Sequence, residues 1–312
     1  MENKSLKQII ANRLEKLDKI RQLGVNPYPY EFNVTYSTSD INKDSVNKKV
    51  SVAGRVMSLR KMGKAAFANI QDASGRVQLY IARDDVGEDN YSLFKLVDIG
   101  DFIGIDGVVF ITKTDALTVK AEKVTVLSKN LRPIPDVKEK DGEKYNSVSD
   151  KELRYRKRYI DMIINPETKD NYIKRFKIIN SIREFLNKNG YIEVETPVLQ
   201  PVYGGANAKP FKTFHNALDQ EFFLRIATEL YLKQLIVGGF EKVYEMSKDF
   251  RNEGIDRSHN PEFTMLEFYQ AYSDYNFMMD FVEEMLKKVA KDLGLKKISW
   301  DGNDIDLSKK FA

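Results

Sequence analysis

The stretch that most constrains this chain lies at residues 250–269, where two β-type segments flank a short polar loop. Its letters are FRNEG at 250–254, HNPEFT at 259–264 and EFY at 267–269. Side chains in a strand alternate between two faces with a period of two residues. This alternation puts Arg251 and Glu253 on one face of the first strand. It puts Phe263, Glu267 and Tyr269 together on one face of the second.

A cation, carboxylates and aromatic rings therefore gather on one surface, with His259 in the connecting loop. A sheet face that only packs on a hydrophobic core does not carry such a set. One alternative is a solvent-exposed hairpin whose charges form surface ion pairs, which contribute little to stability. That explanation suits a single Arg–Glu pair but not the whole set. The pattern favours a functional surface.

Composition limits the possible classes of protein. The 312 residues are enough for about two domains, and 42% hydrophobic residues are enough for real cores. Lys and Arg number 50 against 46 Asp and Glu, and the net charge of +4 is only weak support for a nucleic-acid partner. The absence of cysteine excludes disulfides and thiolate metal sites, and two histidines are too few for structural zinc.

The N-terminal segment has the pattern of a helix. Apolar residues recur at helical spacing from Leu6 to Leu23, broken by charges, and Gly24 ends the pattern. This is not a secretory signal, and no apolar run approaches the ~20 residues that a membrane span needs. The interpretation is a docking helix on a cytoplasmic protein with no membrane partner.

The next region is predicted to be all-β. Five extended runs follow one another at 50–59, 66–71, 76–82, 102–112 and 117–127. Ser74 and Gly75 make a tight turn between the second and third runs, and a short amphipathic helix near 91–97 follows the third. Five strands with a helix after the third predict an OB-fold, a Greek-key barrel that binds oligonucleotides. Residues 128–150 are interpreted as a linker.

The second half changes to longer helices. Pro166 opens a helix with one apolar stripe that Gly190 caps, and a strand at 191–195 closes at Pro197. A further amphipathic helix ends at Gly294, and Asp301 with Gly302 predicts a hairpin turn.

The predicted fold class is α+β. Residues 1–148 are assigned to the helix, the five-stranded OB-fold barrel and the linker. Residues 149–312 are assigned to an antiparallel sheet flanked by helices.

The sequence of residues 250–269 resembles motif 2 of the class II aminoacyl-tRNA synthetases. Within that class it is most similar to lysyl-tRNA synthetase, through the pattern FRNEG…HNPEFT..EFY. The helix and strand at 166–197 resemble motif 1, the dimer-interface element of that family. The resemblance covers essentially the whole chain and implies an anticodon-binding domain followed by a catalytic domain. Motif 3, a glycine-rich segment with an essential arginine, has no counterpart, so we expect a chain truncated within its catalytic domain.

This resemblance implies a reaction and its partners. The carboxylate of L-lysine would attack the α-phosphate of ATP, and lysine would pass from lysyl-adenylate to tRNA(Lys) in a homodimer formed through 166–197. A carboxylate is ionised at neutral pH, so no general base is required and catalysis is positioning and charge stabilisation. Mg²⁺ is the implied cofactor. Its ligands in the family would lie beyond residue 312, with none within this chain.

The ATP site is implied residue by residue. Arg251 would be the catalytic cation that bridges the α-phosphate and the lysine carboxylate, a bidentate task that suits a guanidinium. Glu253 and Asn260 would contact the adenosine part, and His259 the outer phosphate. Phe263 would stack on adenine; the alternative for Phe263 is a core position.

The lysine pocket is implied in the same way. Glu229 resembles the family residue that holds the α-amino group, and Gly205 would let the backbone approach that group closely. Glu267 and Tyr269 match residues that line the lysine side chain. The family carboxylate most directly tied to the ε-ammonium is expected beyond Ala312.

The barrel carries the implied anticodon contacts. Phe67 would stack on the central anticodon uracil, while Gln78 and Glu122 would form hydrogen bonds with it. Arg60, in the loop before Phe67, would serve phosphates. A phenylalanine in a barrel strand is usually a core residue, so this role depends on the resemblance.

Two alternative functions stay open. An aspartyl- or asparaginyl-tRNA synthetase would share the fold, although the carboxylates Glu229 and Glu267 would repel an acidic substrate. The second alternative is a catalytically inactive tRNA-binding fragment, since motif 3 is missing.

Overall fold

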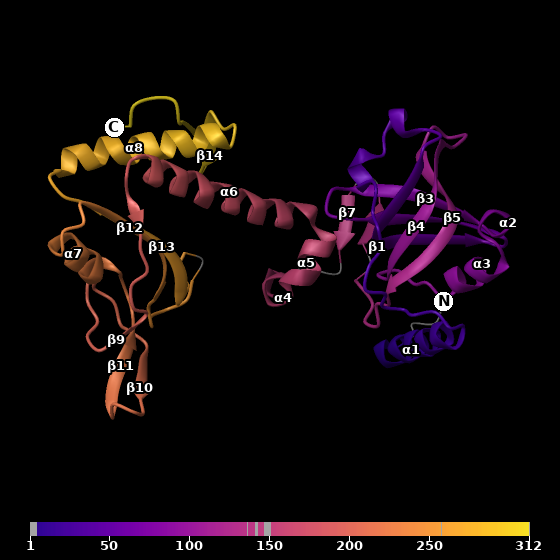
Figure 1. The fold of residues 1–312 in the computed structure, drawn as a ribbon, viewed down its shortest axis with the longest axis horizontal. Helices are drawn as coiled ribbons and strands as arrows, with labels where there is room; N and C mark the ends of the chain where they lie inside the picture. The colour runs from indigo at the N-terminus through magenta and orange to yellow at the C-terminus, as the bar shows by residue number, and fades with distance from the viewer. Residues whose placement is uncertain (1–4, 136, 141–142, 147–150, 257, 312) are drawn as a thin grey trace. The chain divides into compact units, whose positions relative to one another are not determined.

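The computed structural model describes residues 5–135, 137–140, 143–146, 151–256 and 258–311. The chain divides into two compact units, Met1–Ile164 and Asn165–Ala312 (Figure 1). The predicted domain boundary between residues 148 and 149 lies outside the described residues. No helix of the described part is long and apolar enough to cross a membrane.

Unit 1 contains the predicted OB-fold barrel. Its strands close in the order β1-β2-β3-β5-β4, with β3 and β5 as a parallel pair. The bounds are β1 Lys49–Met62, β2 Ala65–Gln71, β3 Arg76–Ala82, β4 Phe102–Ile111 and β5 Leu117–Ser128. The helices α2 Arg83–Val86 and α3 Glu88–Lys95 follow β3. The five predicted runs and the helix after the third are confirmed.

The barrel strands alternate as half-buried sheets do. In β2 and β3 every second residue is buried, so one face fills the core while the other faces outward. Gly107 lets β4 and β5 close tightly, because a Cβ there would lie 2.1 Å from the carbonyl oxygen of Lys120. The ladder shifts by one residue at this point, between Asp106 and Gly107.

The N-terminal helix α1, Leu6–Gln22, docks on unit 1 as predicted. Ser5 caps it in a capping box with Gln8. The Arg13 guanidinium donates hydrogen bonds to the carbonyl oxygens of Asn130 and Ile99, at 2.6 and 3.0 Å. Lys16 forms an ion pair with Asp98 at 2.5 Å. These polar contacts fix the helix in addition to its buried apolar residues.

The predicted linker contains structure that its composition did not indicate. Strands β6, Val137–Lys140, and β7, Glu143–Asn146, pair as an antiparallel hairpin. Two short helices follow it, α4 Lys151–Arg156 and α5 Arg158–Ile164.

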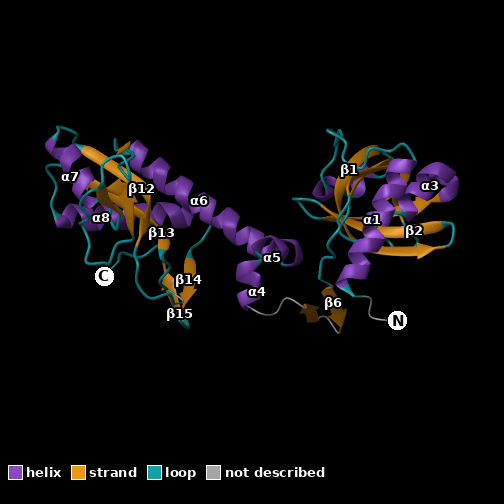
Figure 2. Ribbon diagram, turned by 90° about the horizontal axis from the view of Figure 1, so that it is seen from below, coloured by secondary structure: helices purple, strands orange, loops and turns teal. Residues whose placement is uncertain are grey.

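Unit 2 is built on α6, Pro166–Lys188, and α8, Tyr275–Asp292. The helices pack through Phe185 and Phe281, whose rings lie 4.9 Å apart, and Ser181 donates a hydrogen bond to Asp292 at 2.6 Å. Figure 2 shows them beside the sheet that they cover. Gly190 has a φ of 81° just past α6, the left-handed conformation of a helix cap.

The main sheet of unit 2 has the order β13-β12-β8. Its strands are β8 Ile192–Glu193, β12 Lys242–Phe250 and β13 Glu262–Gln270. Strand β8 is shorter than the predicted 191–195. Strand β12 ends at Phe250, so the prediction that Arg251 and Glu253 share its face is wrong in its extent.

Sequence periodicity missed several smaller elements of unit 2. A second sheet, in the order β10-β11-β9, comprises β9 Leu199–Gln200, β10 Lys212–His215 and β11 Gln220–Leu224. Helix α7, Glu229–Val237, follows β11. The predicted turn at Asp301 and Gly302 is confirmed, because it joins β14, Lys297–Trp300, to β15, Asn303–Asp306.

Candidate functional site

The register of β12 and β13 gathers the predicted residues on one face. Glu245 lies opposite Glu267, and Asp249 lies opposite Phe263. Residues directly opposite in an antiparallel pair point to the same side. The backbone N–H of Arg251 still donates to the carbonyl oxygen of Pro261 at 2.9 Å, so the pairing continues one step past β12. Arg251 thereby joins the predicted Phe263, Glu267 and Tyr269 set.

Arg251 and Phe263 form one end of this face. The guanidinium carbon lies 5.0 Å from the centroid of the Phe263 ring, a cation–π contact. Phe263 is only half-buried, which leaves part of its ring accessible. A terminal nitrogen of Arg251 donates a long hydrogen bond of 3.5 Å to the carbonyl oxygen of Ile226. The guanidinium therefore keeps donors for a ligand.

Glu267 and Tyr269 form the other end. Tyr269 donates a hydrogen bond to Glu267 at 3.1 Å, and the other oxygen of Glu267 accepts from the backbone N–H of Thr228 at 3.3 Å. Burial raises the pKa of Tyr269, and the charges of Glu267 and Glu229 raise it further. The phenol therefore stays protonated, and this end of the face is anionic.

Gly205 and Glu229 meet beside the anionic end. A Cβ on Gly205 would lie 2.9 Å from the Cβ of Glu229 and 3.2 Å from that of Ala227. The φ of Gly205 is +84°, a conformation that other residues rarely adopt. Glu229 begins α7 and pairs with Lys233 at 2.6 Å one turn later. The backbone at Gly205 therefore lies directly against Glu229, and its approach to the α-amino group of lysine stays a prediction.

Three predicted ATP residues lie in the loop between β12 and β13. The carboxylate of Glu253 accepts the backbone N–H of Lys209 at 3.2 Å. His259 is exposed, and its Nδ1 lies 2.8 Å from the carboxylate of Asp256. Asn260 is also exposed. Hydrogen bonds from the backbone of Ser258 and from the His259 side chain lower the pKa of Asp256, which therefore stays ionised beside the imidazole.

A buried ion cluster beneath the face was missed by sequence reasoning. Arg225 pairs with Glu245 at 2.6 Å and with Asp249 at 3.3 Å, and no side chain of the three is more than 5% exposed. Arg225 also donates to the carbonyl oxygens of Lys248 and Thr196, at 2.9 and 3.0 Å. The only sequence signal was two acidic residues four positions apart, on the same face of a strand.

The outer face of the barrel presents a second candidate site. Arg60 lies opposite Phe67 in the β1–β2 ladder, so Arg60 belongs to a strand and the predicted loop position is wrong. The Phe67 ring lies 5.1 Å from that of Tyr80, which lies 6.1 Å from that of Phe110. Gln78 follows on β3 and accepts a hydrogen bond from the Thr118 hydroxyl at 2.8 Å. Sequence reasoning missed the extension of this aromatic surface beyond Phe67.

Comparison with known proteins bears on both sites. Residues 150–312 match the family of class II tRNA synthetases (D, K and N). The chain belongs to this synthetase family. Residues 50–127 match the OB-fold nucleic acid binding domain.

Several relatives of this chain are lysine–tRNA ligases. That of Carboxydothermus hydrogenoformans is 49% identical over 100% of this chain and 63% of its own length. That of Porphyromonas gingivalis strain ATCC 33277 is 52% identical over 96% of this chain and 54% of its own length. That of Thermoanaerobacter pseudethanolicus is 51% identical over 97% of this chain and 60% of its own length. The chain thus spans 54–63% of the length of these curated relatives.

Among the predicted anticodon residues, Glu122 lies furthest from Gln78 along the barrel face. Gln78 pairs with Thr118 on β5, and Glu122 lies four residues further along, about 13 Å away at the usual rise of a strand. Its carboxylate lies instead 3.7 Å from the ammonium of Lys49, on β1. Phe67, Gln78 and Arg60 lie close together, and Glu122 lies further along the same outer face, two residues past Lys120, the partner of Tyr80.

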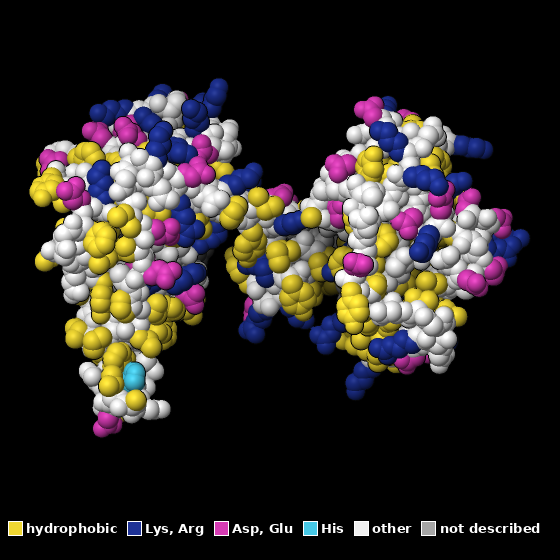
Figure 3. Space-filling view, in the orientation of Figure 1, with side chains coloured by type: hydrophobic (Ala, Val, Ile, Leu, Met, Phe, Trp, Pro, Cys, Tyr) yellow, Lys and Arg dark blue, Asp and Glu magenta, His cyan; other side chains and the backbone are white. Residues whose placement is uncertain are grey.

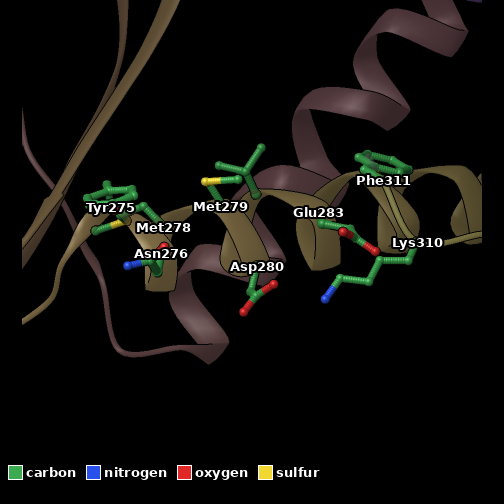
Figure 4. Close-up of a pocket in the computed structure, with 9 residues that line it drawn as sticks. Tyr275, Asn276, Met278, Met279, Asp280, Glu283, Lys310 and Phe311 are labelled. Atoms are coloured by element: carbon green, nitrogen blue, oxygen red, sulfur yellow. The ribbon is translucent and has the colours of Figure 1, made fainter.

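Unit 2 also has a cavity of about 720 Å³ along the first half of α8. Figure 4 shows Tyr275, Met279 and Phe311 among the residues that line it. None of the predicted site residues contributes to its wall. Among the described residues, no group of three His, Asp or Glu side chains is arranged to hold a metal ion.

Proposed function

We propose that this chain activates L-lysine with ATP and transfers it to tRNA(Lys), as a lysine–tRNA ligase. One observation carries the proposal: a single sheet face joins a guanidinium stacked on a phenylalanine to a cluster of carboxylates. Arg251 lies over Phe263 at one end, and Glu267 bonded to Tyr269 lies at the other. The relatives that are lysine–tRNA ligases support the same substrate.

ATP would bind at the Phe263 end. The adenine ring would stack on the exposed part of Phe263, and Arg251 would hold the α-phosphate. The attacking carboxylate of lysine is already ionised, so the residues need only align it and stabilise the charge of the transition state. A guanidinium can contact a phosphate oxygen and a carboxylate oxygen at once, which suits Arg251 to both tasks.

Lysine would bind at the anionic end. Glu229, beside Gly205, would take the α-ammonium, and Glu267 with Tyr269 would face the side chain. Because the pKa of Tyr269 is raised, its hydroxyl keeps its proton and continues to donate to Glu267. An acidic substrate would meet the carboxylates of Glu267 and of Glu229, whose charge Lys233 already pairs, which favours lysine over aspartate.

The loop residues would complete the ATP site. Glu253 and Asn260 are proposed for the adenosine part and His259 for the outer phosphate. Asp256 fixes the imidazole through Nδ1, which leaves Nε2 for the phosphate. Mg²⁺ is proposed to accompany ATP, although among the described residues no group of three His, Asp or Glu side chains is arranged to hold it.

tRNA(Lys) would bind through the barrel face. Phe67 would stack on an anticodon base, Gln78 would read its edge, and Arg60 would contact a phosphate. Gln78 has its amide nitrogen available because its oxygen already accepts from Thr118. Glu122 is proposed to contact the anticodon from further along β5.

A homodimer through residues 166–197 is also proposed. Helix α6 buries Ser181, Phe185 and Leu186, whereas in its N-terminal half the apolar residues Phe176 and Ile173 are 61% and 43% exposed. Hydrophobic side chains are visible on the surface of each unit in Figure 3. A second copy would cover the exposed half of α6. The cytoplasm is the proposed location, on the basis of the family.

The deciding experiment is pyrophosphate exchange into ATP by this chain, with lysine, aspartate and asparagine in turn. Exchange with lysine alone supports the proposed function. Exchange with aspartate or asparagine assigns another substrate. No exchange with any of the three amino acids, together with binding of tRNA(Lys), would identify a tRNA-binding protein without catalysis.

A further inference from the structure

Two buried polar atoms beneath the candidate site have complementary hydrogen-bonding roles and no partner among the described residues. Asp249 Oδ2 is an acceptor, and Arg251 Nε is a donor. Buried polar atoms in folded proteins are nearly always paired, so an unpaired couple calls for an explanation. The two residues are two positions apart, at the end of β12 and just past it, so their side chains share one face.

The charge around Asp249 is unbalanced in a way that favours a second cation. Arg225 is the one guanidinium that pairs with both Glu245 and Asp249, and all three side chains are buried. A buried carboxylate that is only partly compensated is costly. Burial raises the pKa of Asp249, and the charge of Glu245 raises it further. The hydrogen bond from Ser247 and the charges of Arg225 and Arg251 act in the opposite direction. Arg251 thus already acts on this carboxylate.

We propose that Asp249 is a positioning residue for Arg251, whose Nε donates a hydrogen bond to Asp249 Oδ2 when substrate occupies the site. The inference rests on the proposed function, in which Arg251 contacts the α-phosphate and the lysine carboxylate. A guanidinium is planar and rigid, so a bond at Nε fixes the direction of both terminal nitrogens. Arg225 holds Asp249 in turn, because its own hydrogen bonds anchor it to Lys248 and Thr196.

This role acts on the rate more than on binding. An unanchored Arg251 would still attract anionic substrate but would contact the transition state less often in the right orientation. Loss of one charged hydrogen bond of this kind lowers kcat about 10- to 150-fold. The KM for lysine should change less than about threefold, since Glu229 and Glu267 are untouched.

The test variant is Asp249→Asn, which keeps the size of the side chain. Its amide has one acceptor oxygen, and the donors of both Arg225 and Arg251 compete for it, so one arginine faces the NH₂ group. The matched control is Ser247→Ala. It removes the hydroxyl that donates to Asp249 Oδ1 at 2.9 Å and leaves Oδ2 in place.

The direct readout is the Nε–H resonance of Arg251 in protein labelled with ¹⁵N-arginine, assigned by its loss in Arg251→Lys. Saturation with the sulfamoyl analogue of lysyl-adenylate should slow exchange of this proton with water about tenfold in the wild type and in Ser247→Ala. Asp249→Asn should abolish the protection and lower kcat in lysine-dependent exchange. Thermal unfolding checks that each variant is folded.

The outcomes separate the two proposals. Equal protection in Asp249→Asn, or no protection in the saturated wild type, overturns the positioning role while the proposed function stands. Failure of the wild type to bind the analogue in calorimetry defeats the proposed function, and the positioning role falls with it. If Asp249→Asn fails to fold, the positioning role is tested by two measurements only. These are the slowed exchange of the Arg251 Nε proton in the wild type and the kinetics of Arg251→Lys. An unprotected Arg251 then refutes the role.

Discussion

The barrel and the β12–β13 pair both present a candidate binding face, but they treat buried polar atoms differently. The barrel interior is apolar, and on its outer face the oxygen of Gln78 already has a partner in Thr118. Four buried side-chain atoms of the described residues lack a hydrogen-bond partner, and three of them belong to Thr228, Asp249 and Arg251. On the barrel face the oxygen of Gln78 has a hydrogen-bond partner without any ligand. At the β12–β13 site, buried polar atoms lack one within the described part of the chain, and a bound ligand would bring them together as proposed above.

This difference predicts the largest effect at Arg251. Arg251→Lys keeps the charge but removes the planar fork and the Nε donor, so it should reduce lysine-dependent pyrophosphate exchange about 100- to 1,000-fold. tRNA binding and thermal stability should change little, because the barrel does not depend on this residue.

The matched control for Arg251 is Lys248→Ala. Lys248 lies on β12, three residues before Arg251, but is exposed and pairs with Glu262 at 3.6 Å. Its loss should leave exchange within about twofold of the wild type, since a surface ion pair contributes little. Equal losses in both variants would mean that general charge, and not the guanidinium, supports the reaction.

The next effect tests the barrel face alone. Phe67→Ala removes a ring that would stack on an anticodon base, so affinity for tRNA(Lys) should fall about 5- to 150-fold in filter binding, with exchange unchanged. Tyr30→Ala is the control, because Tyr30 is an aromatic residue of the same unit that is fully exposed. A loss of exchange in Phe67→Ala would show that the two faces are not independent.

Much of the site could be predicted from the sequence because strand alternation is a strong geometric rule. It placed Phe263, Glu267 and Tyr269 on one face, as the register shows. The role of Arg225 could not be predicted, because its partners Glu245 and Asp249 lie 20 and 24 residues away and only the folded chain brings them together. The β6–β7 hairpin was missed because its polar composition is typical of a loop.

A moderate effect is expected at the lysine end of the site. Gly205→Ala places a methyl group 2.9 Å from the Cβ of Glu229, so Glu229 or the backbone must move. The KM for lysine should rise about 10- to 100-fold, whereas the KM for ATP should stay near the wild-type value.

Gly302→Ala is the control for Gly205→Ala. Gly302 also has a positive φ, +77°, but nothing lies within 4 Å of its Cβ position. The control carries the backbone strain without the clash. A rise in the KM for lysine in both variants would assign the effect to strain in the fold.

The free energy of unfolding should change with pH in opposite directions at Asp98 in unit 1 and at Asp249 in unit 2. Burial alone would raise the pKa of Asp98, but hydrogen bonds from Lys129 and Lys16 outweigh it and lower the pKa. Asp98 therefore contributes stability above its unfolded pKa, and this is lost as the pH falls below about 4. For Asp249 burial raises the pKa, so its contribution is lost as the pH rises above about 4.

The two carboxylates can be tested by thermal unfolding from about pH 3 to pH 7. Asp98→Asn should weaken the acid-dependent loss of stability in unit 1, and Asp249→Asn should raise the melting temperature of unit 2 at neutral pH. A change of 1 kcal/mol in the free energy of unfolding shifts the melting temperature by about 2–4 °C. Hydrogen exchange read by mass spectrometry distinguishes the units, and a shift of the same sign in both variants would contradict the difference.

The smallest effect is expected at Glu122, which sharpens the boundary of the barrel face. Glu122→Gln keeps the size of the side chain and removes the charge that faces Lys49 at 3.7 Å. Because Glu122 lies four residues beyond the Gln78–Thr118 pair, the affinity for tRNA(Lys) should change less than about twofold. A loss as large as that of Phe67→Ala would show that the tRNA covers both ends of β5, and the anticodon surface would then extend from Phe67 to Glu122.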